Sequence, residues 1–228
     1  MIAVGIAVGT AVGMIAVLYA LAWAYVRRKD AEREGPAGAL MVVLGSGGHT
    51  AEMLTLVRSL PAAEAAEAAP RGPAPAGMTY PRCYVVAETD ALSASKALRL
   101  EGAGGDAGRV RVETVPRSRE VGQSYLTSCL TTMSAMCSAL PVVARHRPRL
   151  LLVNGPGTCL PLCVAARALR ALRLGRTRVV YVESIARVRS LSLTGKLLHA
   201  LGIADRLLVQ WPELAERYRG AVYVGRLV

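Results

Sequence analysis

The residues with the clearest chemical potential in this sequence lie in the glycine-rich stretch 45–50, which reads GSGGHT. The stretch follows a short apolar run, residues 40–44, and precedes residues with the apolar spacing of a helix. A glycine turn between a buried strand and the start of a helix presents backbone N–H groups to an anion, most often a phosphate. A merely structural turn is the alternative. On the first interpretation, the diphosphate-binding residues here are Gly45, Ser46, Gly47, Gly48 and Thr50.

The spacing of these glycines does not fit a dinucleotide site. The fingerprint G-x-G-x-x-G needs a third glycine, and Thr50 occupies that position. The loop therefore favours a phosphate-bearing ligand and argues against NAD.

Two residues are candidates for proton transfer, His49 in this loop and Glu183 directly after the apolar run 178–182. An imidazole can act as a general base or donate a hydrogen bond to a phosphate. For His49 the alternative is a helix cap paired with Glu52. Glu183 can bind sugar hydroxyls or act as a base, or it can merely pair with Arg187.

Further candidates for diphosphate binding follow two other expected strands. Arg117 and Arg119 carry guanidinium groups, whose fork geometry suits phosphate oxygens. The alternative for them is a solvated loop. Asn154, Gly155 and Gly157 form a second turn at which backbone can approach a ligand closely. In that turn the asparagine can instead serve only to brace the loop.

The elements that must position these residues alternate along the chain. Apolar or alternating runs predict strands, and the segments between them have helical spacing. Alternating strands and helices indicate an α/β fold with a Rossmann-like parallel sheet and right-handed crossovers. Capping residues are expected at Asp90 and Thr158. The expected strands cover residues 40–44, 82–87, 109–115, 149–153, 178–182, 205–210 and 221–224.

All strand-to-helix loops of a parallel sheet emerge at one edge, so the candidate residues should meet there. We expect a binding crevice at this edge before anywhere else. The loops concerned are residues 45–50, 88–90, 116–123, 154–158 and 183–187.

The charge balance indicates an anionic partner. The 228 residues include 28 Lys and Arg against 16 Asp and Glu, a net charge of +12. Within residues 145–228 there are 15 basic and four acidic side chains, so +11 lies there. Such a field attracts anionic lipid or a pyrophosphate, although a skewed coding composition can produce part of it. Aromatic and basic residues are not interleaved, which argues against nucleic acid.

The five cysteines include no C-x-x-C pair. We therefore expect reduced, buried thiols and no metal site.

The first 26 residues contain no charged side chain. As a helix they would extend about 39 Å, enough to cross a bilayer. Three basic residues follow at 27–29, so the positive-inside rule predicts a single anchor with a cytosolic globular domain. A cleaved signal peptide is the alternative, but the apolar run is long and lacks a basic start. Residues 27–39 are then a linker, 40–228 the globular domain and 61–79 a mobile Ala/Pro-rich insertion.

Eight motifs closely resemble one family, in order along nearly all of residues 40–228. It is the membrane-anchor subunit of the UDP-N-acetylglucosamine transferase that adds the second GlcNAc to dolichol-diphosphate-GlcNAc (the asparagine-linked glycosylation protein fourteen family). Ala186, Arg189 and the insertion depart from the family pattern, but these departures put no motif residue in doubt. The motifs are GSGGHTAEM (45–53), VVAETD (85–90), VPRSREVGQS (115–124), NGPGTCLP (154–161), YVESIARV (181–188), SLTGKLL (192–198), VQWPEL (209–214) and YVGRLV (223–228).

The resemblance implies the acceptor half of a two-domain (GT-B) glycosyltransferase, anchored in the endoplasmic reticulum membrane with a luminal N-terminus. It implies a lipid-linked diphosphate sugar as acceptor, and a soluble catalytic subunit that holds the UDP-GlcNAc donor. No cofactor is then bound by this chain alone, which is expected to be inactive without its partner. A scaffold with a vestigial site and a free-standing nucleotide-dependent enzyme are the alternatives. The implied partner contact is formed by Tyr223, Gly225, Arg226, Leu227 and Val228.

Overall fold

The computed structural model describes residues 40–59, 82–102, 110–117, 125–155 and 157–227 of the chain. These residues belong to one compact unit, which begins at Pro36. The expected anchor, linker and Ala/Pro-rich insertion lie outside the described residues and stay predictions. Within the described ranges, no helix combines the length and apolarity needed to cross a membrane.

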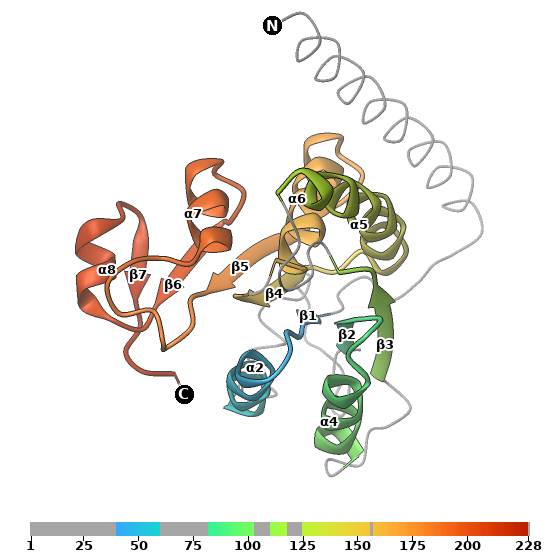
Figure 1. The fold of residues 1–228 in the computed structure, drawn as a ribbon, viewed down its shortest axis with the longest axis horizontal. Coiled ribbons are helices and arrows are strands. Elements are labelled where there is room, and N and C mark those ends of the chain that lie inside the picture. Colours follow the sequence, from blue (N-terminus) through green and yellow to red (C-terminus); the bar gives the residue numbers. More distant parts are fainter. Residues whose placement is uncertain (1–39, 60–81, 103–109, 118–124, 156, 228) are drawn as a thin grey trace, which may run out of the picture. The chain divides into compact units, whose positions relative to one another are not determined.

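Seven parallel strands form one sheet in the order β3-β2-β1-β4-β5-β6-β7, as Figure 1 shows. This confirms the predicted parallel α/β class, and each strand lies within one residue or so of its expected position. The strands are β1 (Leu40–Val43), β2 (Arg82–Ala87), β3 (Val110–Val115), β4 (Leu150–Asn154), β5 (Arg178–Val182), β6 (Arg206–Val209) and β7 (Ala221–Tyr223).

Helices cover both faces of this sheet. The pair α2 and α4 lies on one face, and α5, α6 and α7 lie on the other (Figure 1), while the short α8 packs against β6 and β7. The helices are α2 (Gly48–Ser59), α4 (Ala91–Gly102), α5 (Tyr125–His146), α6 (Cys159–Ala171), α7 (Leu193–Ala200) and α8 (Pro212–Arg217).

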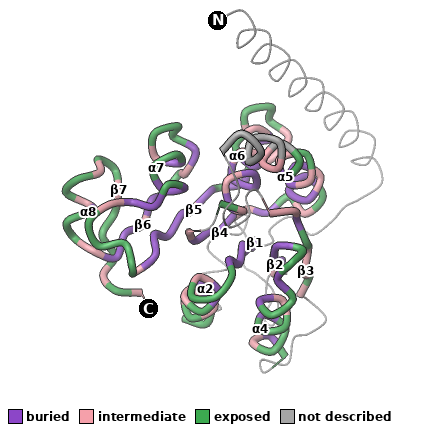
Figure 2. The backbone as a smooth tube through the Cα atoms, in the orientation of Figure 1, coloured by how far each residue is buried: buried purple, intermediate pink, exposed green. Residues whose placement is uncertain are grey.

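The centre of the sheet is the core of the protein, and Figure 2 shows the buried strands between exposed helical faces. All four residues of β1 are buried, which explains why this strand reads as a continuous apolar run. Tyr84 and Leu44 pack in the same cluster, together with Met53 and Val57 from α2. The apolar face of α2 therefore fixes the helix whose first turn follows the glycine loop.

Two expected details differ from the structure. Thr158 has a helical backbone conformation and its side chain makes no capping bond, because the turn before α6 is already helical there. Cys137 is exposed on α5, although Cys83, Cys159 and Cys163 are buried as expected. The other capping prediction is confirmed, since Asp90 Oδ1 accepts a hydrogen bond from the Ser93 backbone N–H at 3.1 Å.

The chain reverses its direction across the sheet at β1. The sequence β1, β2, β3 proceeds to one side, and the chain then crosses back so that β4 pairs with the other side of β1. The crevice beyond the carboxyl ends of two such strands is the usual ligand site of an open α/β sheet. The loops after β1 and β4 meet there.

Candidate active site at the β1–β4 crevice

The loop after β1 presents the first turn of α2 to solvent. Ser46, Gly47 and Gly48 are exposed, and α2 begins at Gly48. Gly47 has a φ of 65°, a left-handed conformation in which glycine carries no Cβ penalty. The free N–H groups and the positive end of the helix dipole therefore face an open edge, as the sequence predicts for an anion site.

Two of the five predicted loop residues lie beneath this surface. Gly45 is buried, and its carbonyl oxygen accepts hydrogen bonds from the Thr50 hydroxyl and, at 3.1 Å, from the Ser93 hydroxyl. Thr50 is fully buried, and its Oγ1 lies 2.6 Å from Ser93 Oγ. The Thr50 hydroxyl thus braces the loop against α4, and this position does not favour direct contact with a ligand.

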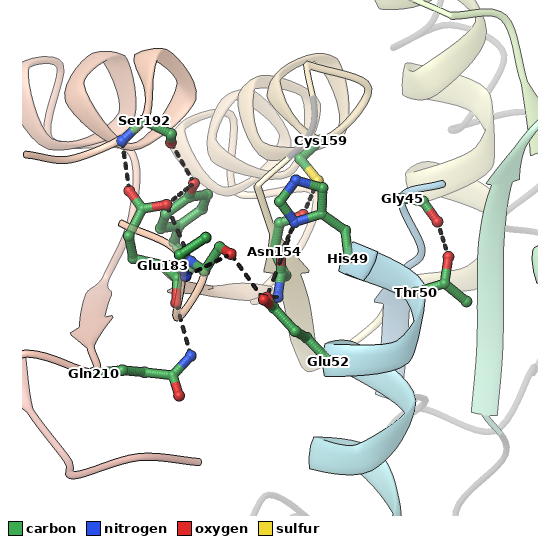
Figure 3. A network of polar contacts seen from close by, with 12 residues as sticks. Gly45, His49, Thr50, Glu52, Asn154, Cys159, Glu183, Ser192 and Gln210 are labelled. Atoms are coloured by element: carbon green, nitrogen blue, oxygen red, sulfur yellow. Dashed lines mark hydrogen bonds and ion pairs between the residues drawn. The ribbon is translucent and has the colours of Figure 1, made fainter. Parts of the chain in front are cut away.

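A chain of four hydrogen-bonded side chains links the carboxyl ends of β1, β4 and β5 (Figure 3). His49 Nδ1 lies 2.8 Å from Asn154 Oδ1. Asn154 Nδ2 donates to Glu52 Oε2 at 2.8 Å, and Ser184 Oγ donates to Glu52 Oε1, also at 2.8 Å. His49 and Glu52 lie in the first turns of α2, Asn154 is the last residue of β4, and Ser184 follows β5. The tertiary fold thus joins positions more than 100 residues apart.

The hydrogen-bonding groups of these four side chains determine the tautomer of His49. A carboxylate only accepts hydrogen bonds, so the Asn154 amide must turn its NH₂ group toward Glu52 and its oxygen toward His49. The amide oxygen in turn can only accept, so Nδ1 of His49 must carry a proton. In the neutral imidazole, Nε2 is then the ring nitrogen with a free lone pair. We call this chain of His49, Asn154, Glu52 and Ser184 the relay. It leaves His49 able to accept a proton at Nε2.

Gly155 makes room for the imidazole. A Cβ atom built at this position would lie 2.5 Å from Cε1 and 2.6 Å from Nδ1 of His49. Gly155 also has a φ of 67°, where a side chain is strained. The turn after β4 therefore requires glycine for two reasons, the close approach of His49 and the left-handed backbone. Gly157 is exposed, with open space around its Cα.

Asn154 is held in place by its own neighbours. It is only 2% exposed, and the Cys159 thiol donates to its carbonyl oxygen at 3.6 Å. Burial raises the pKa of this thiol to about 12, so Cys159 remains a neutral donor. Asn154 is thus both the brace that the sequence suggested and the direct partner of His49.

Glu183 lies beneath the rim of the crevice. Its side chain is fully buried, and it accepts hydrogen bonds from the backbone N–H groups of Ser184 at 3.1 Å and Ser192 at 2.8 Å. Tyr181 donates a third bond at 3.3 Å. The carboxylate therefore closes the loop 184–192 by binding both of its ends. This position favours a bracing role and does not favour contact with a sugar or pairing with Arg187.

Burial perturbs this carboxyl group. Desolvation raises the pKa of Glu183 above its usual 4.5, and the hydrogen bonds from Ser192 and Ser184 oppose that rise. The pKa of Tyr181 is raised, first by burial and then by the charge of Glu183. Gly195 completes the packing, since a Cβ there would lie 2.6 Å from Glu183 Oε2.

The remaining predicted residues lie farther along the same edge or outside the described ranges. Arg117 follows β3, and its buried Nε atom has no hydrogen-bond partner among the described residues. Arg119 lies outside the described residues. The structure thus brings His49, Asn154 and Gly155 together, whereas Arg117 follows a strand two positions away from β1.

The chain after β7 returns to the edge of the crevice. Gln210 links the two regions, because its Nε2 donates to the Glu183 carbonyl at 3.0 Å and its Oε1 accepts from the Leu227 N–H at 2.9 Å. The Arg226 guanidinium lies 4.8 Å from the ring centroid of Trp211. Tyr223 is exposed and Gly225 has a φ of 76°. Val228 lies outside the described residues.

Sequence reasoning missed the roles of Glu52, Ser184 and Gln210. The sequence suggests Glu52 only as a partner of His49, and its Oε2 is indeed 4.0 Å from Nδ1. Its short contacts, however, are to Asn154 and Ser184. The one available signal was position, because Ser184 follows β5 at the edge where the other candidates were expected. Among the described residues, no cluster of three His, Cys, Asp or Glu side chains can hold a metal ion.

Comparisons with known proteins find one family of similar sequences. The family model described as "Oligosaccharide biosynthesis protein Alg14 like" matches residues 40–227. Proteins named "UDP-N-acetylglucosamine transferase subunit ALG14" are similar to this chain. The one from Rattus norvegicus is 44% identical over 212 residues and the one from Homo sapiens 41% over 213, each match covering 90% of both chains. The Schizosaccharomyces pombe protein of the same name is 37% identical, covering 92% of this chain and 95% of its own.

A solved structure with a similar fold gives a further comparison. The crystal structure of Acinetobacter baumannii MurG superposes with a TM-score of 0.51 and 14% sequence identity. The match covers 83% of this chain and 45% of the MurG chain, so the present chain spans less than half the length of that protein. At this identity the likeness concerns the fold alone.

Proposed function

This chain belongs to the Alg14-like family of oligosaccharide biosynthesis proteins, and from this premise we propose that it is the acceptor-binding subunit of a UDP-N-acetylglucosamine transferase. In this proposal a soluble catalytic subunit carries the UDP-GlcNAc donor. The present chain anchors the complex to the cytosolic face of the endoplasmic reticulum membrane and presents GlcNAc-diphosphate-dolichol. The product carries a second GlcNAc.

The relay at the β1–β4 crevice carries this proposal. In the transfer, a hydroxyl oxygen of the acceptor sugar forms a bond to the anomeric carbon of the donor, and the bond from that carbon to UDP breaks. The electron pair leaves with UDP, and the hydroxyl proton needs a base. His49 Nε2 is suited to accept it, because Asn154 and Glu52 keep the proton of the neutral ring on Nδ1.

The acceptor diphosphate has a complementary surface next to this base. The exposed residues Ser46, Gly47 and Gly48 open the first turn of α2, and His49 belongs to the same turn. A helix start and its free N–H groups favour phosphate oxygens. A diphosphate held there would place the attached sugar within reach of His49.

The edge strand β7 is suited to contact the partner subunit. β7 is the last strand of the sheet, and the apolar residues Val222, Tyr223 and Val224 are exposed at it. An exposed apolar edge strand is usually covered by another chain or protected from one. The C-terminal residues Arg226 and Leu227 follow directly, so we place the partner contact along 222–228.

The test is a transfer assay on the complex of the full chain with its catalytic subunit, using UDP-GlcNAc and a lipid-diphosphate-GlcNAc acceptor. His49→Gln should lower turnover by about 10²- to 10⁴-fold, the usual contribution of a general base, while the partner still co-purifies. His146→Gln is the matched control. His146 is the last residue of α5, away from the crevice, and its Nε2 contacts Glu113 Oε1 on β3 at 2.8 Å.

Two results would contradict the proposal. Full turnover by His49→Gln would favour a scaffold with a vestigial site. Transfer of GlcNAc by the purified full chain alone would show that it is not an obligate subunit.

A further inference from the structure

The helix α7 exposes a line of leucines. Leu193 is 61% exposed, Leu197 37% and Leu201 65%. Leu201 caps the helix, so the three residues are spaced by four and lie on one helical face. We call this set the leucine face. Large apolar side chains gathered on one exposed face indicate a surface that binds another protein or a membrane.

The opposite side of α7 is fixed in the protein, so the leucine face cannot turn inward. Leu198 is fully buried, and the Ser192 side chain accepts the Gly195 N–H at 3.0 Å as the helix cap. His199 Nε2 lies 2.9 Å from the carbonyl oxygen of Arg219. The helix lies beside α6, on the face of the sheet opposite α2 (Figure 1).

Positive charge accompanies the leucine face. Residues 184–204 contain no acidic residue, and their basic residues Arg187, Arg189 and Lys196 are all exposed. Within the helix, Lys196 adjoins Leu197, and its long side chain can extend toward a charged surface beside buried leucines. Apolar side chains edged by basic ones are typical of helices that lie in the interface of an anionic membrane.

The chain that precedes β1 limits how far this domain can lie from a bilayer. The apolar segment ends at residue 26 and β1 starts at Leu40, leaving the 13 residues 27–39. Fully extended, such a linker spans at most about 45 Å. A domain tethered so closely meets the membrane surface repeatedly. An anionic surface would attract the leucine face and the basic residues beside it.

We propose that the leucine face of α7 docks on an anionic lipid bilayer, with its leucines among the acyl chains and Lys196 at the headgroups. The proposal rests on the membrane anchoring in the proposed function. It adds a second, peripheral contact that orients the domain. Because the leucine face begins one residue after Ser192, whose N–H binds Glu183, docking would bring the rim of the crevice toward the headgroups. A lipid-linked diphosphate could then reach the first turn of α2 with its tail still in the bilayer.

The experiment places a photoreactive p-benzoyl-phenylalanine at Leu197 of the full chain, reconstituted in phosphatidylcholine nanodiscs with or without phosphatidylserine. The matched control carries the same residue at Leu98, which is 52% exposed on α4 at the other face of the sheet. After irradiation, mass spectrometry measures lipid adducts. We expect adducts at position 197 on anionic discs and few at position 98. Lys196→Glu should lower the yield at 197 by at least about fivefold, the effect of one basic side chain near an anionic surface.

Each other outcome has a defined meaning. Equal lipid adducts at both positions, or adducts of position 197 to the co-purified catalytic subunit in place of lipid, would overturn the docking surface. Alkaline carbonate extraction tests the anchor separately. If the chain is retained and position 197 takes no lipid, only the α7 proposal fails. Release of the chain would refute the anchoring, and with it the α7 proposal.

Discussion

Replacing Gly155 with alanine should separate the position of His49 from the stability of the fold. The new Cβ would lie 2.5 Å from Cε1 and 2.6 Å from Nδ1 of the imidazole. An ordinary contact needs about 3.5 Å, so the ring must move by roughly 1 Å. Such a shift would stretch the 2.8 Å bond between His49 and Asn154 beyond hydrogen-bonding distance.

The size of the effect follows from two terms. Alanine at the left-handed φ of 67° costs about 1–2 kcal/mol, and overpacking adds about 1–3 kcal/mol. The free energy of unfolding should therefore fall by about 2–5 kcal/mol. A misplacement of about 1 Å in a catalytic group lowers turnover about 100-fold.

Gly202 offers the matched control. It has a similar φ of 59°, but a Cβ there would meet nothing within 4 Å. Gly202→Ala should carry only the backbone cost of about 1–2 kcal/mol and leave turnover unchanged. Urea unfolding measures both stabilities, and the transfer assay on the assembled complex measures turnover. If folded Gly155→Ala had the same turnover as Gly202→Ala, the claim that turnover depends on the position of the His49 ring would be refuted.

Three further predictions address the relay, the buried carboxylate and the partner edge. Glu52→Ala leaves the buried Asn154 NH₂ without its acceptor, so it should cost about 1–3 kcal/mol of stability and let the His49 tautomer vary in ¹⁵N NMR spectra. Glu52→Gln should preserve the tautomer, because its amide oxygen can still accept; equal spectra for the two variants would contradict the relay. Burial raises the pKa of Glu183, so its contribution to stability is fully present below about pH 4.5 and is lost as pH rises through the raised value. Glu183→Gln should flatten the dependence of the unfolding free energy on pH over that interval, and an unchanged slope would exclude this group as its source. Val222→Asp on the exposed edge of β7 should reduce co-purification of the catalytic subunit, whereas Leu98→Asp on α4, at a leucine that is also exposed, should not. Equal recovery of the partner with both variants would place the contact elsewhere.

Local sequence was sufficient to determine the elements and the edge at which they present their loops. The run 40–44 reads as a buried strand because both faces of β1 are covered. Asp90 caps α4 through bonds within three residues. The glycine loop before α2 combines a strand end, a left-handed residue and a helix start, all of which depend on neighbouring residues alone.

The site itself depended on contacts that no local pattern encodes. Asn154 reaches His49, 105 residues away, because β4 pairs with β1, and strand order is not written in the periodicity of either strand. Thr50 and Glu183 have the residue types of ligand-binding groups, yet the packing of α4 and of the loop 184–192 buries them. Spacing along the chain predicts which loops share an edge. Only the packed tertiary structure decides which side chains at that edge face a ligand, because their burial depends on distant neighbours.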